Sequence, residues 1–274
     1  MLRNGIRLVM LLAAGSLAAG SCTVREDRQP CPCYLDMDYR ELLAADLFSG
    51  EPGMVDVALF HPELAGHSTY SLGTCPEMEE QAVSRDTVRV VAVVGSRLPE
   101  GFPQLGTKIC YEAGNQMDSL YVHTGQVDCA AESALCVLRP LKQFSTLTLT
   151  DGEGGAMLRQ YNLVVRGATC GLDAADLSAV DGPYLYTVQD YDRNGRISVR
   201  IPRQKERGLM LDFYDKTTYQ RLFSTPLGLY LFDAGYDPDA PELSDYAFQI
   251  DFERALVYLR IADWEDEYVY QWFK

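Results

Sequence analysis

The chain has 274 residues, a formal net charge of −15, 47% hydrophobic residues and eight cysteines. This hydrophobic fraction excludes a disordered chain, and the length allows one or two domains with sizeable cores. The acidic excess argues against nucleic acid as a partner, because binding phosphates requires a basic surface.

The N-terminus has the layout of a secretory signal: two arginines, a short apolar run at 8–14 and then small residues. The apolar run is too short to span a bilayer. The sequence AGSC at 19–22 resembles a bacterial lipobox, in which cleavage before the cysteine is followed by its acylation. We therefore expect a lipoprotein signal at 1–21, a lipid on Cys22 and a tether at 22–32. An ordinary signal peptide followed by a structural cysteine is the alternative.

The rest of the chain consists mainly of short β-type runs separated by Gly, Pro, Asp and Asn. The expected strands cover residues 33–39, 55–60, 87–94, 119–124, 135–138, 144–150, 158–166, 184–191, 196–202, 209–214, 220–224, 229–232, 248–252, 255–262 and 268–273. Short helices are expected at 39–47 and 174–180. The pattern predicts an all-β chain of two antiparallel β-sandwich domains with minor short helices.

A domain boundary is expected at residues 138–139, ahead of the strand at 144, because this position divides the chain nearly evenly. The N-terminal sandwich would then cover 33–138 and the C-terminal sandwich 139–274. Each half has about enough strands for a seven-stranded sandwich. No strong internal repeat is visible in the sequence.

An Asn-Gly pair between two alternating runs predicts a hairpin over 184–202 with a type I′ turn. Asp190, Asp192 and Asn194 also match the first half of an EF-hand calcium loop. The twelfth position of that loop is Ile201, where a bidentate Glu is needed. A turn with Asx-type hydrogen bonds explains the same residues and is favoured over the calcium site.

Catalytic motifs are missing from the sequence. It contains no Gly-x-Ser-x-Gly elbow, no HExxH zinc helix and no paired C-x-x-C knuckles. Its 39 acidic residues always supply carboxylate pairs, so their abundance is weak support for glycoside hydrolysis. We predict no enzymatic activity, no metal and no cofactor other than the covalent lipid.

Seven cysteines follow Cys22, and an odd number cannot all pair within one chain. They are Cys31, Cys33, Cys75, Cys110, Cys129, Cys136 and Cys170. Cys129 and Cys136 are near enough to close a small disulfide loop. The favoured alternative is that some cysteines are free and buried as small apolar side chains. Strand alternation would point Cys31 and Cys33 to the same face.

Residues 22–39, CTVREDRQPCPCYLDMDY, combine a lipobox cysteine, a charged tether and a first strand. This arrangement resembles the FimB-like fimbrial anchor and accessory lipoproteins of the fimbrillin superfamily. CVLRPLKQFSTLTL at 136–149 is similar to the strand that opens their second domain, and GLMLDFYD at 208–215 also fits. The resemblance implies two tandem transthyretin-like domains in a type V pilus, exposed on the bacterial surface and lipid-anchored to the outer membrane.

Pilus subunits of this group assemble by strand exchange, which is β-strand addition, so the implied partners are fimbrial structural subunits. Stalk subunits lose their first strand by cleavage after a basic residue, and Arg139 is the position where such a cut is conceivable here. An uncleaved anchor or accessory subunit is the favoured interpretation.

The aromatic C-terminal strand is the candidate contact with the next subunit. Its residues are Tyr268, Val269, Tyr270, Gln271, Trp272 and Phe273. An unpaired aromatic edge is an aggregation hazard, so a partner covering it is physically sensible, although an internal sheet strand is the equally simple alternative. Two other functions stay open: a surface glycan-binding lipoprotein, suggested by 17 Tyr, 10 Phe and 2 Trp, and a lipid-tethered hydrolase.

Overall fold

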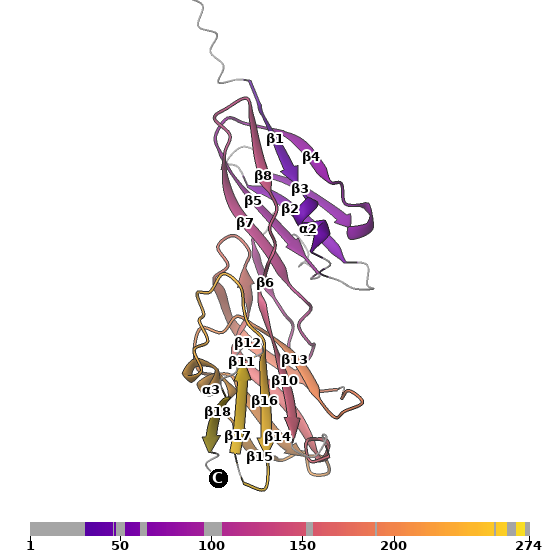
Figure 1. Cartoon of the computed structure of the whole chain (residues 1–274), viewed down its shortest axis with the longest axis vertical. Coiled ribbons are helices and arrows are strands. Elements are labelled where there is room, and N and C mark those ends of the chain that lie inside the picture. The colour runs from indigo at the N-terminus through magenta and orange to yellow at the C-terminus, as the bar shows by residue number, and fades with distance from the viewer. Residues whose placement is uncertain are drawn as a thin grey trace, which may run out of the picture.

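The structure is a computed structural model of the whole chain. It describes residues 31–45, 47, 53–60, 65–95, 106–151, 156–189, 191–254, 256–261 and 267–271. The predicted signal, Cys22 and most of the tether lie outside the described residues. Within the described ranges, no helix is long and apolar enough to cross a membrane. Figure 1 shows an elongated molecule of two lobes stacked end to end.

Two sheets build the upper lobe of Figure 1. The β1 sheet has the order β4-β1-β8, formed by β4 (Met78–Val83), β1 (Cys33–Asp38) and β8 (Ser133–Val137). The β2 sheet has the order β3-β2-β5-β7-β9, formed by β3 (Ala65–Ser71), β2 (Met54–Phe60), β5 (Thr87–Val94), β7 (Tyr121–Asp128) and β9 (Leu141–Lys142). The short helices α2 (Arg40–Ala44) and η1 (Leu72–Thr74) complete the lobe.

Two further sheets build the lower lobe. The β10 sheet has the order β13-β10-β16-β17-β18, formed by β13 (Ile197–Pro202), β10 (Phe144–Asp151), β16 (Tyr246–Asp251), β17 (Leu256–Ile261) and β18 (Glu267–Gln271). The β11 sheet has the order β12-β11-β14-β15, formed by β12 (Ala179–Thr187), β11 (Tyr161–Asp173), β14 (Met210–Asp215) and β15 (Arg221–Thr225). A short strand, β6 (Lys108–Cys110), also pairs with β11. The helices of this lobe are η2 (Leu158–Gln160) and α3 (Leu227–Asp233).

The two lobes repeat one strand order. The first strand of each lobe lies between an antiparallel and a parallel neighbour: β1 between β4 and β8, and β10 between β13 and β16. The second sheets correspond as well, β3-β2-β5-β7 to β12-β11-β14-β15. The lower lobe differs by adding β17 and β18 beyond β16. The all-β prediction is confirmed, and the repeated order shows a symmetry that the sequence does not display.

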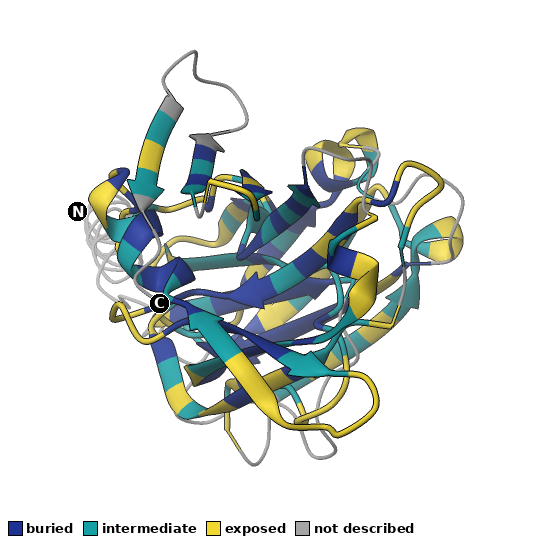
Figure 2. Cartoon of the chain, turned by 90° about the horizontal axis from the view of Figure 1, so that it is seen from below, coloured by how far each residue is buried: buried dark blue, intermediate teal, exposed yellow. Residues whose placement is uncertain are grey.

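The hydrophobic pattern of β5 explains how the lobes are joined. Val90, Ala92 and Val94 pack into the upper core, whereas Val91 and Val93 belong to a buried cluster that continues into the lower lobe. The strand is therefore apolar on both faces, because both faces are covered. Figure 2 shows the buried positions in dark blue, concentrated on the central strands, with exposed positions on the surrounding turns.

Two predicted elements are wrong. The strand predicted at 229–232 is part of helix α3, whose buried residues Leu227, Tyr230 and Leu231 follow the helical spacing of three and four. The helix predicted at 174–180 is a turn that leads into β12. There the Asp173 carboxylate accepts the Ala175 N–H at 3.0 Å, and such local side-chain bonds compete with a helix.

The hairpin predicted over 184–202 is also wrong, because β12 and β13 belong to different sheets. The Asp192 carboxylate accepts the N–H groups of Asn194 at 2.8 Å and Arg196 at 2.7 Å, which makes a wider Asx turn than a type I′ hairpin needs. In the described chain, positive φ at non-glycine residues occurs at Leu177 and Tyr219 and not at Asn194.

Among the described residues, one disulfide joins Cys110 to Cys170 and so links β6 to β11. The predicted Cys129–Cys136 loop closure is wrong, since both thiols are free and buried, as the favoured alternative expected. Cys31 is exposed and Cys33 is buried, so they do not share a face. The reason is that β1 begins only at Cys33, and strand alternation does not extend back to Cys31.

Candidate functional site

The C-terminal strand β18 is the last strand of the β10 sheet among the described residues. It pairs with β17 on one side through an antiparallel register in which Val269 lies opposite Tyr258. The side chain of Val269 is 56% exposed, and its neighbours Tyr268 and Tyr270 are half-buried. Among the described residues no strand pairs with the other edge of β18, and Val269 is its exposed apolar side chain. Trp272 and Phe273 lie outside the described residues, and nothing is described of the Gln271 side chain.

Helix α3 supports β18 from the inner side. The Tyr270 ring stacks on the Tyr230 ring with centroids 4.2 Å apart, and its hydroxyl donates a hydrogen bond to the Tyr230 carbonyl at 3.2 Å. Burial raises the pKa of Tyr270 to about 12, so the hydroxyl remains a neutral donor. The stacked pair holds β18 against α3.

A second edge lies in the upper lobe at β8, which ends the β1 sheet among the described residues. Leu135 is 57% exposed on this strand, whereas Cys136 points inward and is buried. The sequence predicted the strand but not its edge position. The sequence shows only an alternating run that contains Leu135. Such a run does not reveal which strands pair with each other.

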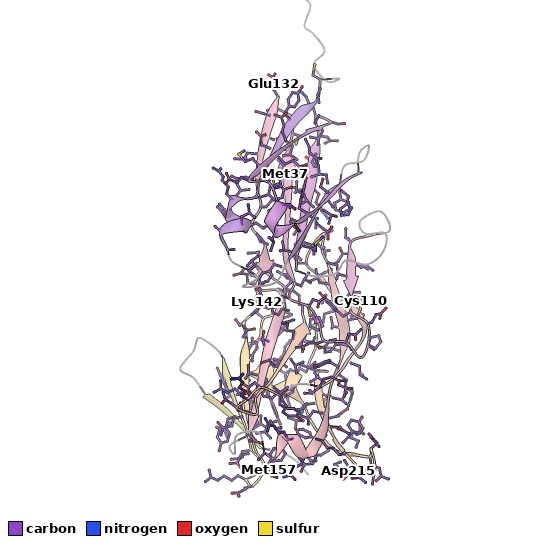
Figure 3. The ribbon with its side chains drawn as sticks, turned by 90° about the vertical axis from the view of Figure 1, so that its right-hand side faces the viewer. Met37, Cys110, Glu132, Lys142, Met157 and Asp215 are labelled. Carbon is purple, nitrogen blue, oxygen red and sulfur yellow. A yellow bond between two sulfur atoms is a disulfide. The ribbon has the colours of Figure 1, made fainter. Side chains whose placement is uncertain are left out.

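The first strand, β1, has the opposite character. It lies between β4 and β8, and its inward side chains Cys33, Leu35 and Met37 are fully buried. Figure 3 marks the ends of the molecule by Glu132, beside the start of β1, and by Asp215. Figure 1 shows that β18 runs toward the lower end. The fold thus begins at one end of the molecule and finishes near the other.

This fold occurs in the solved structure of a fimbrial protein. The chain matches the fimbrial anchor protein Mfa2 from Porphyromonas gingivalis with a TM-score of 0.58 at 10% identity, over 85% of this chain and 98% of that one. The chain has the Mfa2 fold. No protein-family model and no curated protein matches the sequence.

Two other solved structures share the Mfa2 fold with this chain. A candidate polysaccharide-binding protein from Bacteroides thetaiotaomicron matches with a TM-score of 0.61 at 13% identity, over 88% of this chain and 99% of that one. A candidate adhesin from Bacteroides ovatus matches with a TM-score of 0.57 at 14% identity, over 92% of this chain and 98% of that one. The expected resemblance to fimbrial anchor and accessory proteins is confirmed at the level of the fold.

Other residues that the sequence singled out make local contacts in this Mfa2 fold. Arg139 is exposed on the segment between the lobes, with its guanidinium 2.7 Å from the Glu41 carboxylate. Asp192 uses its carboxylate for the turn described above, and Asp190 lies outside the described residues. Among the described residues, no group of three or more His, Cys, Asp or Glu side chains is placed to hold a metal. The calcium site therefore stays an untested alternative.

Proposed function

We propose that this chain is an accessory structural subunit of a cell-surface fimbria, with the anchor role as its specific form. A lipid on Cys22 attaches it to the bacterial outer membrane, and β18 contacts the next subunit. The observation that carries the proposal is that the buried first strand and β18, the last described strand of its sheet, lie toward opposite ends of an Mfa2 fold. Such a subunit has a membrane end and an assembly end.

At the membrane end, the subunit must be held firmly in the membrane by its lipid. Multiple acyl chains on Cys22 give stable anchoring, whereas one chain alone binds a membrane only marginally. The tether at 22–32 leads directly into β1, which hydrogen-bonded neighbours hold on both sides. A pulling force on the fibre therefore meets a central strand rather than a peelable edge. The proposal also includes two domains that are divided near residue 138, and a chain that is not cleaved and so keeps β1.

The assembly end works by β-strand addition. A strand of the partner subunit pairs with the outer edge of β18, where main-chain hydrogen bonds supply affinity and side-chain pockets supply specificity. Val269 gives the partner an apolar contact. A charged side chain at this position would oppose pairing, because natural proteins use lysine to protect strand edges from association.

The test replaces Val269 by Lys and measures how much fimbrial subunit copurifies with the outer-membrane protein. We expect a loss of roughly tenfold, corresponding to about 1.4 kcal/mol of binding free energy. The matched control is Leu222→Lys on β15, because Leu222 is 52% exposed on the edge strand of the other sheet of the same lobe. The control should retain the subunit. Loss in the control with retention in Val269→Lys would reverse the assignment of the edge.

The same assay contains an arm for the lipid. Cys22→Ser should remove lipid labelling and release the protein from the membrane fraction, while the released protein still captures the fimbrial subunit through β18. Retention of labelled lipid in this variant would refute the anchor assignment at Cys22. Fibres unchanged in length and attachment after deletion of the whole protein would refute the accessory role.

A further inference from the structure

The lower lobe carries a groove beside the start of β11 and the ends of β12 and β14. The cavity has a volume of about 580 Å³. Four tyrosines line it, Tyr161, Tyr191, Tyr214 and Tyr219, and we call it the tyrosine groove. Its turn at Asp215 lies at the end of the molecule opposite Glu132 (Figure 3). The groove is therefore remote from the start of β1.

The strand register builds the floor of the groove. Asn162 on β11 lies directly opposite Tyr214 on β14, and Val164 lies opposite Thr187 on β12. The buried neighbours Leu163 and Phe213 point to the core, so alternation turns Asn162 and Tyr214 outward. The part of the floor built by β11 is thus an inner part of the sheet, hydrogen-bonded to β12 on one side and to β14 on the other.

The turn after β14 forms one wall and holds Tyr219 out. The Asp215 carboxylate accepts the N–H groups of Thr217 at 2.8 Å and Thr218 at 2.6 Å, and these bonds lower its pKa. Tyr219 follows with a φ of 57°, a left-handed conformation that few non-glycine residues adopt, and its side chain is 74% exposed. A strained backbone thus carries an aromatic ring that is exposed to solvent. Backbone strain of this kind is common at binding sites.

Two of the other rings are fixed in place. Tyr161 stacks on Phe252 with centroids 5.7 Å apart and meets Phe213 edge-on at 5.6 Å. Tyr191 donates its hydroxyl to the Leu158 carbonyl at 3.3 Å, and the Arg159 guanidinium lies 5.5 Å from its ring centre. Tyr161 lies two residues before Leu163 and contacts the buried Phe213, so its ring belongs to the core side of the groove. The fixed Tyr191 ring needs little ordering when a ligand binds, which favours affinity.

The polar lining completes the chemistry. Asn162 and Gln189 supply amides that both donate and accept hydrogen bonds, and Lys216 supplies an ammonium donor. The described lining contains no carboxylate, although the chain has 39 acidic residues. Flat aromatic faces match the C–H faces of a pyranose ring, and amides match its paired hydroxyls.

We propose that the tyrosine groove binds an oligosaccharide. The role of Lys216 differs between two classes of oligosaccharide. In a neutral sugar a hydroxyl group accepts its hydrogen bond, and in an acidic sugar a carboxylate does. The inference is independent of the β18 edge, which belongs to the other sheet of the lobe.

The experiment titrates the detergent-solubilised full chain with a panel of soluble neutral and carboxylate-bearing oligosaccharides, using calorimetry. We expect at least one to bind and Tyr219→Asn to weaken it tenfold or more. Asparagine keeps the left-handed backbone accessible while removing the ring, so the variant should fold. Tyr214→Ala should weaken the same ligand. Tyr34→Ala, at a partly exposed tyrosine on β1, is the matched control and should bind as the unmodified chain does.

Lys216→Gln separates the two classes of sugar. Weaker binding confined to acidic oligosaccharides identifies the ligand as acidic, and equal binding of neutral ones before and after the change identifies it as neutral. No binding across the panel would overturn the proposal. So would full binding in both Tyr219→Asn and Tyr214→Ala, or a preference for a peptide probe. The Val269→Lys variant should bind the oligosaccharide normally, which keeps this result distinct from failure of the fimbrial assignment.

Discussion

His123 shows how a single side chain secures the segment between the lobes. Its Nδ1 accepts the Arg139 N–H at 3.2 Å, and its Nε2 lies 3.7 Å from the Cys136 sulfur. Burial lowers the pKa of His123 from its ordinary 6.5. Accepting a backbone hydrogen bond at Nδ1 requires a neutral ring, so protonation breaks the contact as well as burying a charge.

Stability should therefore fall as the pH drops through and below 6.5. The unfolded chain binds a proton at His123 more readily than the folded chain does, so the free energy of unfolding decreases as the pH falls. The contribution of His123 to stability is fully present above its pKa in the unfolded chain. Urea unfolding at pH 7.5 and pH 5.5 measures the change. His123→Gln should show a smaller decrease over this interval, and an identical decrease in both proteins would contradict the prediction.

Residues that act through chain-distant contacts were the hardest to predict. Cys110 and Cys170 are 60 residues apart, and neither flanking sequence indicates that they meet. The spacing of Cys129 and Cys136 favoured a loop that the fold does not form, because burial of each thiol in the core prevails over proximity along the chain. The tyrosine groove could not be predicted from the sequence either, because its rings come from distant parts of the chain: β11, β14 and two turns.

Elements were predictable where one face of a strand is buried. β1, β10 and β13 show clear alternation and lie close to their predicted positions. β3 and β4 were missed because AGHSTYS and MEEQAV are largely polar, and β6 was missed because three residues show no periodicity. Pairing was not predictable from pattern at all, as the separation of β12 and β13 into different sheets shows.

The pairing of β6 with β11 depends on a glycine. A Cβ atom at Gly171 would overlap the Ile109 carbonyl, so a side chain there forces β6 away from β11. We expect Gly171→Ala to lower the free energy of unfolding by about 2 kcal/mol or more, a size typical of backbone displacement in a packed region. Urea denaturation measures this. Gly73→Ala is the matched control, because no atom lies within 4 Å of its added Cβ, and it should change stability little.

At the scale of the whole molecule, two similar lobes are fused through shared contacts. The Thr124 hydroxyl of the upper lobe donates to the Ala175 carbonyl at 2.8 Å, and the Arg200 guanidinium of the lower lobe donates to the Met117 carbonyl at 3.2 Å. β6 crosses from the chain segment of the upper lobe into a lower sheet. This fusion suits the anchor role that we propose, because a flexible joint would concentrate force on the connecting segment.

The fused core predicts one cooperative unfolding transition. Calorimetry of the full chain should give a single peak whose calorimetric and van't Hoff enthalpies agree, because the buried cluster around Val91 and Val93 spans both lobes. Replacing Cys110 and Cys170 together by Ser should lower stability by about 2–4 kcal/mol, the usual worth of a disulfide, and shift the single peak to lower temperature. Two separate peaks in the unmodified chain would show that the lobes unfold independently. Two peaks in the double variant alone would show instead that the disulfide, and not the shared core, couples them.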